Sequence, residues 1–130
     1  MSTSTERIIS PDKVVWVGIL LIAALGLIHL LEAPDELEEA TYLGLLFLAN
    51  FGGAVVAAIG IYRNYRWGWL LGVMLAGGSI VGYVVSCTVG LPGLDVEPWL
   101  QPLGVLALLV EALFVGLWLT NSVRRAQRAI

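Results

Sequence analysis

A small number of polar residues lie inside long apolar segments, where their side chains could move a proton or bind a cation. Glu111 is the one charged residue of the segment Trp99–Thr120, and Asn50 and Ser79 lie well inside two other apolar segments. Ionisable groups within membrane segments are costly and mark ion or proton pathways by default. No lysine or arginine is available at that depth, so we expect Glu111 to be a neutral acid. It either carries a proton or cation, or fastens helices by bonding Asn50 or Ser79.

A second candidate set lies nearer the outer ends of the same segments. His29 and Glu32 are spaced i, i+3, so the carboxyl group can orient the ring and leave one nitrogen for a metal or proton. Cys87, at a similar depth, could add a soft ligand for copper or zinc. The alternatives are a histidine that reaches headgroup water and a cysteine that acts as a small hydrophobe. One His and one Glu are too few for a metal site, and one His supplies one haem ligand. We therefore expect no cofactor and leave a metal open.

Tyr83 connects these two sets. Ser79, Tyr83 and Cys87 follow one another at intervals of four, which places them on one helical face. At about 1.5 Å of rise per residue, Tyr83 lies between the outer groups and the midplane. The spacing predicts a ladder of polar groups that leads from the outer surface to Glu111.

The segments that must position these residues are transmembrane helices. Of the 130 residues, 58% are hydrophobic and only 13% are charged, whereas a soluble domain typically carries about 25% charged residues. Apolar runs of about 20 residues cross a bilayer as helices. The sequence predicts an all-α, polytopic membrane protein. It is a single domain, 1–130, that forms a bundle of four transmembrane helices over about 14–32, 40–62, 67–91 and 99–121.

The charges predict how this bundle is oriented. The lysines and arginines fall in the two tails and in the connection around residues 63–66, while the loops around 33–39 and 92–98 are acidic. The positive-inside rule then places both termini in the cytoplasm of a prokaryotic plasma membrane. The basic residues are Arg7, Lys13, Arg63, Arg66, Arg124, Arg125 and Arg128.

Turn and helix-start signals occur in both outer loops. Acidic residues favour a helix N-terminus, so we expect residues 35–39 to open the second helix, with Pro34 at its start. These acidic residues act either as a solvated helix cap or as a group that collects cations at the mouth of a pore. Gly90-Leu91-Pro92-Gly93 predicts a turn, and Glu97-Pro98-Trp99 is expected to open the fourth helix.

Small residues predict how the helices pack, because they let backbones approach closely. The third predicted helix has one ridge at Gly78, Gly82, Ser86 and Gly90 and another at Gly68, Gly72 and Ala76. Two such ridges predict two neighbouring helices, so we expect this helix to lie at the centre of the bundle.

A resemblance to known proteins extends over nearly the whole chain. It rests on the turn Gly90–Gly93, the segments Glu97–Trp99 and Pro102–Gly104, and Glu111. The sequence resembles a group of uncharacterised small four-helix membrane proteins of haloarchaea and actinobacteria. These resemble it in the GLPG turn, in an outer histidine, here His29, and in a glutamate of the last helix. The resemblance implies the fold and points to His29 and Glu111, but it implies no activity.

Three functions remain open from the sequence. The first is an accessory or structural membrane protein, in which the polar ladder serves packing and assembly. The second is an oligomeric proton or cation transport module, with Glu111 as the carrier and His29 and Glu32 at its outer mouth. The third is a metal- or haem-binding redox component that uses His29, Glu32 and Cys87.

Several classes of function are not expected. We predict no enzyme, because no phosphate-binding loop, dinucleotide fingerprint or activated nucleophile occurs. We predict no nucleic-acid partner, because the net charge is −3 and a duplex requires a basic face. The expected partners are the lipid bilayer and a homo-oligomer or larger membrane complex.

Overall fold

Four helices make up the regular structure of the part of the chain that is described. The computed structural model describes residues 11–129, with side chains for 13–123. The helices are α1 (Pro11–Glu39), α2 (Thr41–Tyr62), α3 (Arg66–Thr88) and α4 (Pro102–Ala129). Each contains a span long and apolar enough to cross a membrane, which is compatible with a multi-pass membrane protein. The predicted all-helical class is confirmed.

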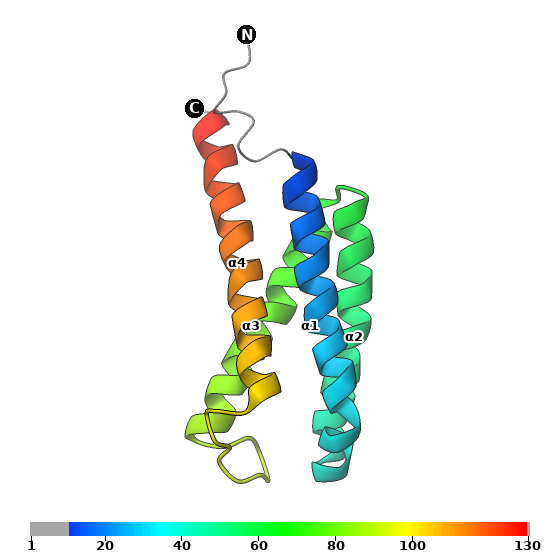
Figure 1. The fold of residues 1–130 in the computed structure, drawn as a ribbon, viewed down its shortest axis with the longest axis vertical. Coiled ribbons are helices and arrows are strands. Elements are labelled where there is room, and N and C mark those ends of the chain that lie inside the picture. The colour runs from blue at the N-terminus through cyan, green and yellow to red at the C-terminus, as the bar shows by residue number, and fades with distance from the viewer. Residues whose placement is uncertain (1–10, 130) are drawn as a thin grey trace.

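The helices run alternately up and down and form a ring (Figure 1). α1 packs against α2 and α4, and α3 also packs against α2 and α4. The predicted pair of neighbours for α3 is present, but its predicted central position is wrong. Closure of α4 onto α1 gives every helix two neighbours, so no helix is at the centre. The ends of α1 and α4 at Pro11 and Ala129 lie at the same end of the bundle.

The connection between α1 and α2 differs from the prediction. α1 continues through Pro34 to Glu39, so the acidic residues end α1 and do not open α2. Only Ala40 separates the two helices, and its backbone N–H donates to Glu36 O at 2.9 Å. The first helix was predicted to end near residue 32, where the run of apolar residues ends. The backbone needs no apolar side chains to continue its hydrogen bonds, so the helix extends beyond them.

The connection between α3 and α4 is a loop over residues 89–101, and α4 begins at Pro102. The predicted turn is present, with positive φ at Gly90 and Gly93, a conformation that favours glycine. Glu97-Pro98-Trp99 does not open α4. Instead, Glu97 N–H donates to Ser86 O at 2.8 Å, which folds the loop back onto the end of α3.

The core fills one half of the bundle, at the end where α1 begins. Its residues come from the first halves of α1 and α3, from the second half of α2 and from the middle of α4. The predicted ridge at Gly68 and Gly72 packs here. A Cβ at Gly68 would lie 2.6 Å from backbone atoms of α2, and one at Gly72 would lie 2.6 Å from the Phe114 ring. The buried core is Val14, Ile22, Leu25, Ala54, Ala57, Ile61, Trp69, Ala76 and Phe114.

The outward faces of the helices are apolar and exposed. Leu20, Leu31 and Val81 each expose 60% or more of their surface. Exposed apolar surface on all sides is unfavourable in water and is the normal outer surface of a membrane bundle.

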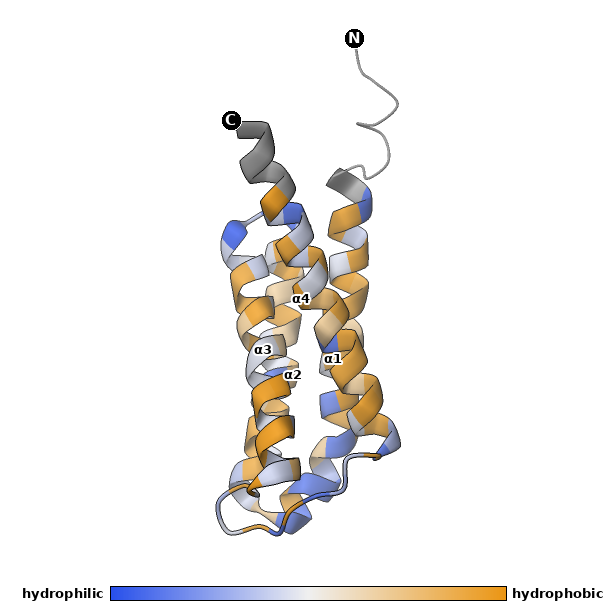
Figure 2. Ribbon diagram, turned by 90° about the vertical axis from the view of Figure 1, so that its left-hand side faces the viewer, coloured by the Kyte–Doolittle hydropathy of each residue, from blue (hydrophilic) through white to orange (hydrophobic). Residues whose placement is uncertain are grey.

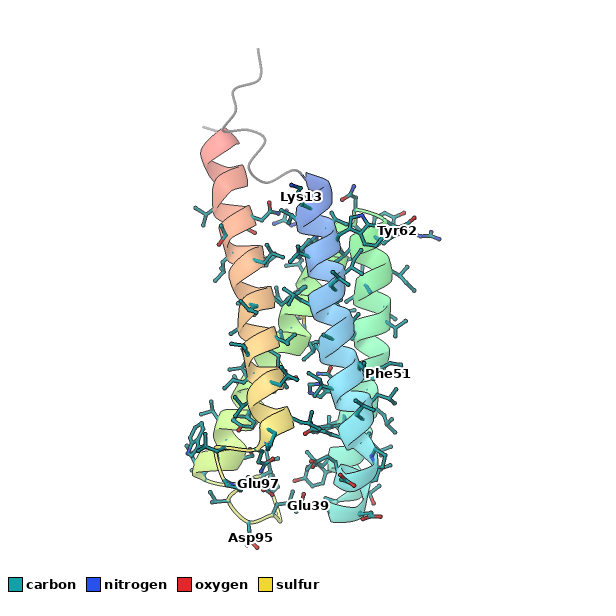
Figure 3. The ribbon with its side chains drawn as sticks, in the orientation of Figure 1. Lys13, Glu39, Phe51, Tyr62, Asp95 and Glu97 are labelled. Carbon is teal, nitrogen blue, oxygen red and sulfur yellow. The ribbon has the colours of Figure 1, made fainter. Side chains whose placement is uncertain are left out.

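Hydrophilic residues lie mainly towards the two ends of the bundle (Figure 2), and the sign of the charge differs between these ends. Among described side chains, Lys13 marks the end of the bundle opposite Glu39, Asp95 and Glu97 (Figure 3). Arg63 and Arg66 follow α2 and open α3 at the same end as Lys13. Arg7 lies outside the described residues, as do the side chains of Arg124, Arg125 and Arg128.

Candidate functional site

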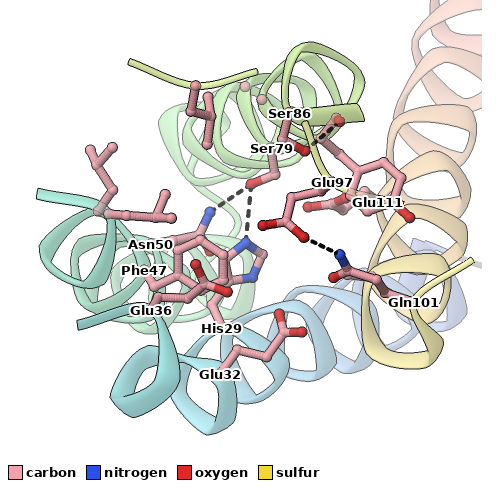
Figure 4. A pocket seen from close by; sticks show the side chains of 18 of the residues that line it. His29, Glu32, Glu36, Phe47, Asn50, Ser79, Ser86, Glu97, Gln101 and Glu111 are labelled. Carbon is pink, nitrogen blue, oxygen red and sulfur yellow. Dashed lines mark hydrogen bonds between the residues drawn. The ribbon is translucent and has the colours of Figure 1, made fainter. Parts of the chain in front are cut away.

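A pocket of about 590 Å³ occupies the acidic half of the bundle (Figure 4). All four helices and the 89–101 loop contribute to its lining. The core packs the other half, so the bundle is solid at its basic end and hollow at its acidic end. The polar lining residues are His29, Glu32, Glu36, Glu39, Asn50, Ser79, Tyr83, Ser86, Asp95, Glu97, Gln101 and Glu111.

The ridge of small residues that begins at Gly78 explains why this half is hollow. A Cβ added at Gly78 or Gly82 would meet no atom within 4 Å, and both residues line the pocket together with Ser86. Gly90 lies beyond the end of α3, in the turn. The prediction that this ridge packs against a helix is therefore wrong. Its missing side chains leave space for the pocket, whereas those of Gly68 and Gly72 allow helix contact.

A chain of hydrogen bonds joins α1, α2 and α3 on the pocket wall. Asn50 Nδ2 donates to Ser79 Oγ at 2.8 Å, and Ser79 Oγ lies 3.4 Å from His29 Nε2. His29 Nδ1 lies 2.9 Å from Leu25 O. A carbonyl only accepts, so Nδ1 carries the proton, and in a neutral ring Nε2 accepts from Ser79. The chain thus has one direction, from Asn50 through Ser79 to His29.

Glu111 lies at the closed end of the pocket. The residue is only 2% exposed, and its Oε2 atom has no hydrogen-bond partner. Ser79 is close enough to interact with it. Ser79 has a single O–H, which His29 Nε2 and Glu111 both approach, so it cannot satisfy both. Asn50 Oδ1 is also buried without a partner. Once Glu111 is ionised, the closed end therefore has more acceptors than donors.

His29 lies deeper than its position in the sequence suggests. The prediction placed it near the outer boundary with Glu32 and Cys87, because α1 was expected to end near residue 32. α1 instead runs ten residues past His29, which places about 15 Å of helix beyond it. His29 lies beside Ser79, and His29 and Glu32 of the predicted outer set share one pocket with the predicted central residues.

The mouth of the pocket is lined by carboxyl groups. Glu36 is close enough to Glu32, Glu39 and Glu97 for their charges to interact. Gln101 Nε2 donates to Glu97 Oε2 at 2.8 Å. No lysine or arginine lines the pocket among the described side chains. The acidic segment 35–39 was identifiable from the sequence, but it was predicted on the wrong helix. Its proximity to Asp95 and Glu97 was not predicted.

Two predicted site residues hold the loop in place. Tyr83 lines the pocket, and its hydroxyl donates to Trp99 O, while its ring lies edge-on to Trp99 at 6.0 Å. Cys87 does not line the pocket. It is buried, and its Sγ lies 3.7 Å from Pro98 O. The structure thus separates Cys87 from His29 and Glu32.

The pocket can bind a positively charged group by charge and by acceptor atoms. Within the described residues, no three or more His, Cys, Asp or Glu side chains are arranged to hold a metal ion. No family model, no curated protein and no solved structure matches this chain.

Proposed function

We propose that this chain is a multi-pass membrane protein that takes a cationic solute into the acidic pocket from the outer side of the membrane. Glu111 is the carboxyl group that pairs with the cation, and binding is the first step of transport. The observation that carries the proposal is the position of Glu111, almost fully buried with an unpartnered oxygen, at the closed end of a pocket that no described lysine or arginine lines.

The proposed orientation follows from the separation of charges. Lys13, Arg63 and Arg66 lie at the end opposite the pocket, and cytoplasmic ends of membrane helices are rich in lysine and arginine. The pocket then faces outward and both termini are cytoplasmic. We place the protein in the plasma membrane of a prokaryote.

Binding is coupled to release of a proton. A lone carboxylate within a membrane bundle is costly, so Glu111 is a neutral acid when the pocket is empty. A bound cation supplies the missing counter-charge and displaces the proton. Glu32 of α1 is close enough to Glu111 for their charges to interact, and His29 of α1 approaches the same Ser79 hydroxyl as Glu111. The residues of α2 that line the pocket carry no ionisable side chain.

Passage to the cytoplasm requires a second conformation. The core between Trp69 and Phe114, whose rings stack at 5.5 Å, closes the basic half of the bundle. We propose that transport proceeds in a homo-oligomer or larger complex, because one bundle of this size leaves no room for a wide pore.

Calorimetry in two buffers of different ionisation enthalpy tests the binding step. Purified protein in a non-ionic detergent is titrated with hexylammonium and with hexyltrimethylammonium, and binding of either satisfies the proposal. We expect release of about one proton per bound cation. Glu111→Gln should bind more weakly and release none. Glu38→Gln is the matched control, because Glu38 is exposed on α1 and does not line the pocket.

The accessory or structural role is the second candidate, and the Asn50–Ser79–His29 chain favours it because it ties three helices together. It predicts no binding of either cation and full tolerance of Glu111→Gln. That pair of results would refute the transport proposal.

A further inference from the structure

Apart from the O–H of a neutral Glu111, which is lost when the cation binds, the side-chain donors of the pocket already have acceptors. Asn50 Nδ2 donates to Ser79, and Gln101 Nε2 donates to Glu97. Ser86 Oγ donates to Tyr83 O at 2.7 Å, and the Tyr83 hydroxyl donates to Trp99 O. A ligand that needs donors from the protein therefore finds few in this pocket.

Acceptors, in contrast, remain unfilled at the closed end. Glu111 Oε2 and Asn50 Oδ1 are both buried without a partner, and both residues neighbour Ser79. A buried acceptor without a donor costs about 1–3 kcal/mol, and more where the group is charged. A ligand that brings its own N–H groups removes this cost, whereas a ligand without them leaves it.

The walls between the mouth and the closed end are apolar. Leu43, Leu46, Phe47, Met74 and Leu75 line the pocket together with Gly78 and Ala107. A volume of about 590 Å³ lies in the range of sites for small organic molecules, and such sites are mostly apolar with a few polar groups. A bare inorganic ion would leave most of this space unfilled.

The aromatic lining does not form a cage for a quaternary ammonium ion. Such ions are recognised by the open faces of several aromatic rings. Here Phe47 lies against His29 with ring centroids 4.9 Å apart, and Tyr83 lies against Trp99. The closed end offers oxygen acceptors in place of ring faces.

We propose that the ligand is an organic ammonium ion that carries N–H groups and an apolar body. Its N–H groups donate to the Glu111 carboxyl and the Asn50 amide oxygen, and its body lies along Leu46, Leu75 and Phe47. This inference rests on the proposed function and narrows it from cations in general to protonated amines.

The test compares three probes that share a six-carbon chain: hexylammonium, hexyltrimethylammonium and 1-hexanol. Each is titrated into the purified full chain in non-ionic detergent at constant ionic strength, with titration into empty micelles subtracted. Hexylammonium should bind at least about tenfold more tightly than hexyltrimethylammonium, which has the charge but no N–H group. Hexanol, which is neutral, should be weaker still.

The variants locate the ammonium group. Glu111→Gln should remove the preference for hexylammonium, and Glu38→Gln should retain it. A Glu111→Gln protein that keeps the full preference would overturn the inference, because the ammonium group would then lie elsewhere. If that variant does not fold, the affinities of the three probes for the native protein still show whether the ligand needs N–H groups.

Failure of the inference and failure of the proposed function give different results. Equal affinity for hexylammonium and hexyltrimethylammonium overturns the requirement for N–H groups but leaves cation binding intact. Absence of binding by both cations overturns the inference and the proposed function together.

Discussion

At the scale of single residues, Ser79 holds the hydrogen-bonded wall of the pocket together. It accepts from Asn50, approaches His29 Nε2 and neighbours Glu111, so one hydroxyl joins groups from all four helices. Asn50, His29 and Glu111 occupy the same pocket because each approaches this hydroxyl.

Replacement of Ser79 by alanine should therefore destabilise the bundle. We expect a loss of about 1 kcal/mol, the usual size of an interhelical hydrogen bond in a membrane protein. Ser86→Ala is the matched control on the same helix, since Ser86 Oγ bonds only locally, to Tyr83 O and Cys87 Sγ. Unfolding of both variants in mixed micelles measures the difference. Equal stabilities of the two variants would show that the hydrogen bonds among Asn50, Ser79 and His29 contribute nothing to helix association.

At the scale of elements, the continuity of α1 decides how deep the site lies. Pro34 lies inside this helix, where its ring removes the N–H that would bond the carbonyl of Leu30. Had α1 ended before Pro34, His29 would lie near the surface and not beside Ser79.

Pro34→Ala tests this continuity. In an unbroken helix the alanine restores a hydrogen bond, so we expect stabilisation of up to about 3 kcal/mol. Pro102→Ala is the control, because Pro102 is the first residue of α4, where the missing N–H is harmless. Circular dichroism and unfolding in micelles provide the measurement. Destabilisation by Pro34→Ala would instead indicate that Pro34 opens a second helix.

The two glycine ridges of α3 differ in what they face, and this too is a property of elements. Gly72 packs against the Phe114 ring, whereas Gly78 faces open space in the pocket. The same residue type thus closes the bundle in one half and opens it in the other.

Alanine substitutions distinguish the two ridges. Gly72→Ala places a Cβ 2.6 Å from Phe114 and should destabilise the bundle by about 1–3 kcal/mol. Gly78→Ala meets no neighbour within 4 Å and should be neutral or stabilising by up to about 1 kcal/mol, because alanine favours helix. Thermal unfolding of the two variants checks both expectations. A large loss on Gly78→Ala would mean that this face is packed.

At the scale of the whole molecule, the bundle is asymmetric along its length. The basic end is solid and the acidic end is hollow, and all the described carboxyl groups from Glu32 to Glu39 lie at the hollow end. In the proposed function, the solute enters at the hollow end, so the orientation in the membrane determines which compartment supplies it.

Cysteine labelling tests the proposed orientation. Cys87 is the only cysteine, so Cys87→Ala provides a background for single Glu38→Cys and Arg66→Cys variants. A membrane-impermeant maleimide added to intact cells should label the cysteine at position 38. The cysteine at position 66 should react only after permeabilisation, because the two positions lie at opposite ends. The reverse pattern would place the pocket in the cytoplasm.

The free energy of transferring each side chain from water to lipid determines where the membrane-spanning helices lie. This quantity can be read from the sequence. Runs such as Val14–Leu31 and Ala40–Tyr62 predict membrane-spanning helices because each residue contributes its own transfer energy, nearly independently of its neighbours. The turn at Gly90 and Gly93 was predictable for a similar reason, because glycine readily adopts positive φ. These features depend on a residue and its immediate neighbours in the chain.

The pocket, in contrast, depends on which side chains fill the space between helices, and only the tertiary structure decides this. The sequence did not distinguish Gly72, which faces Phe114, from Gly78, which faces no atom, because both satisfy the same spacing rule. Nor did it place His29 beside Ser79, since that contact needs the true length of α1. The polar residues were identifiable one by one, but their assembly around Glu111 follows from how four helices close into a ring.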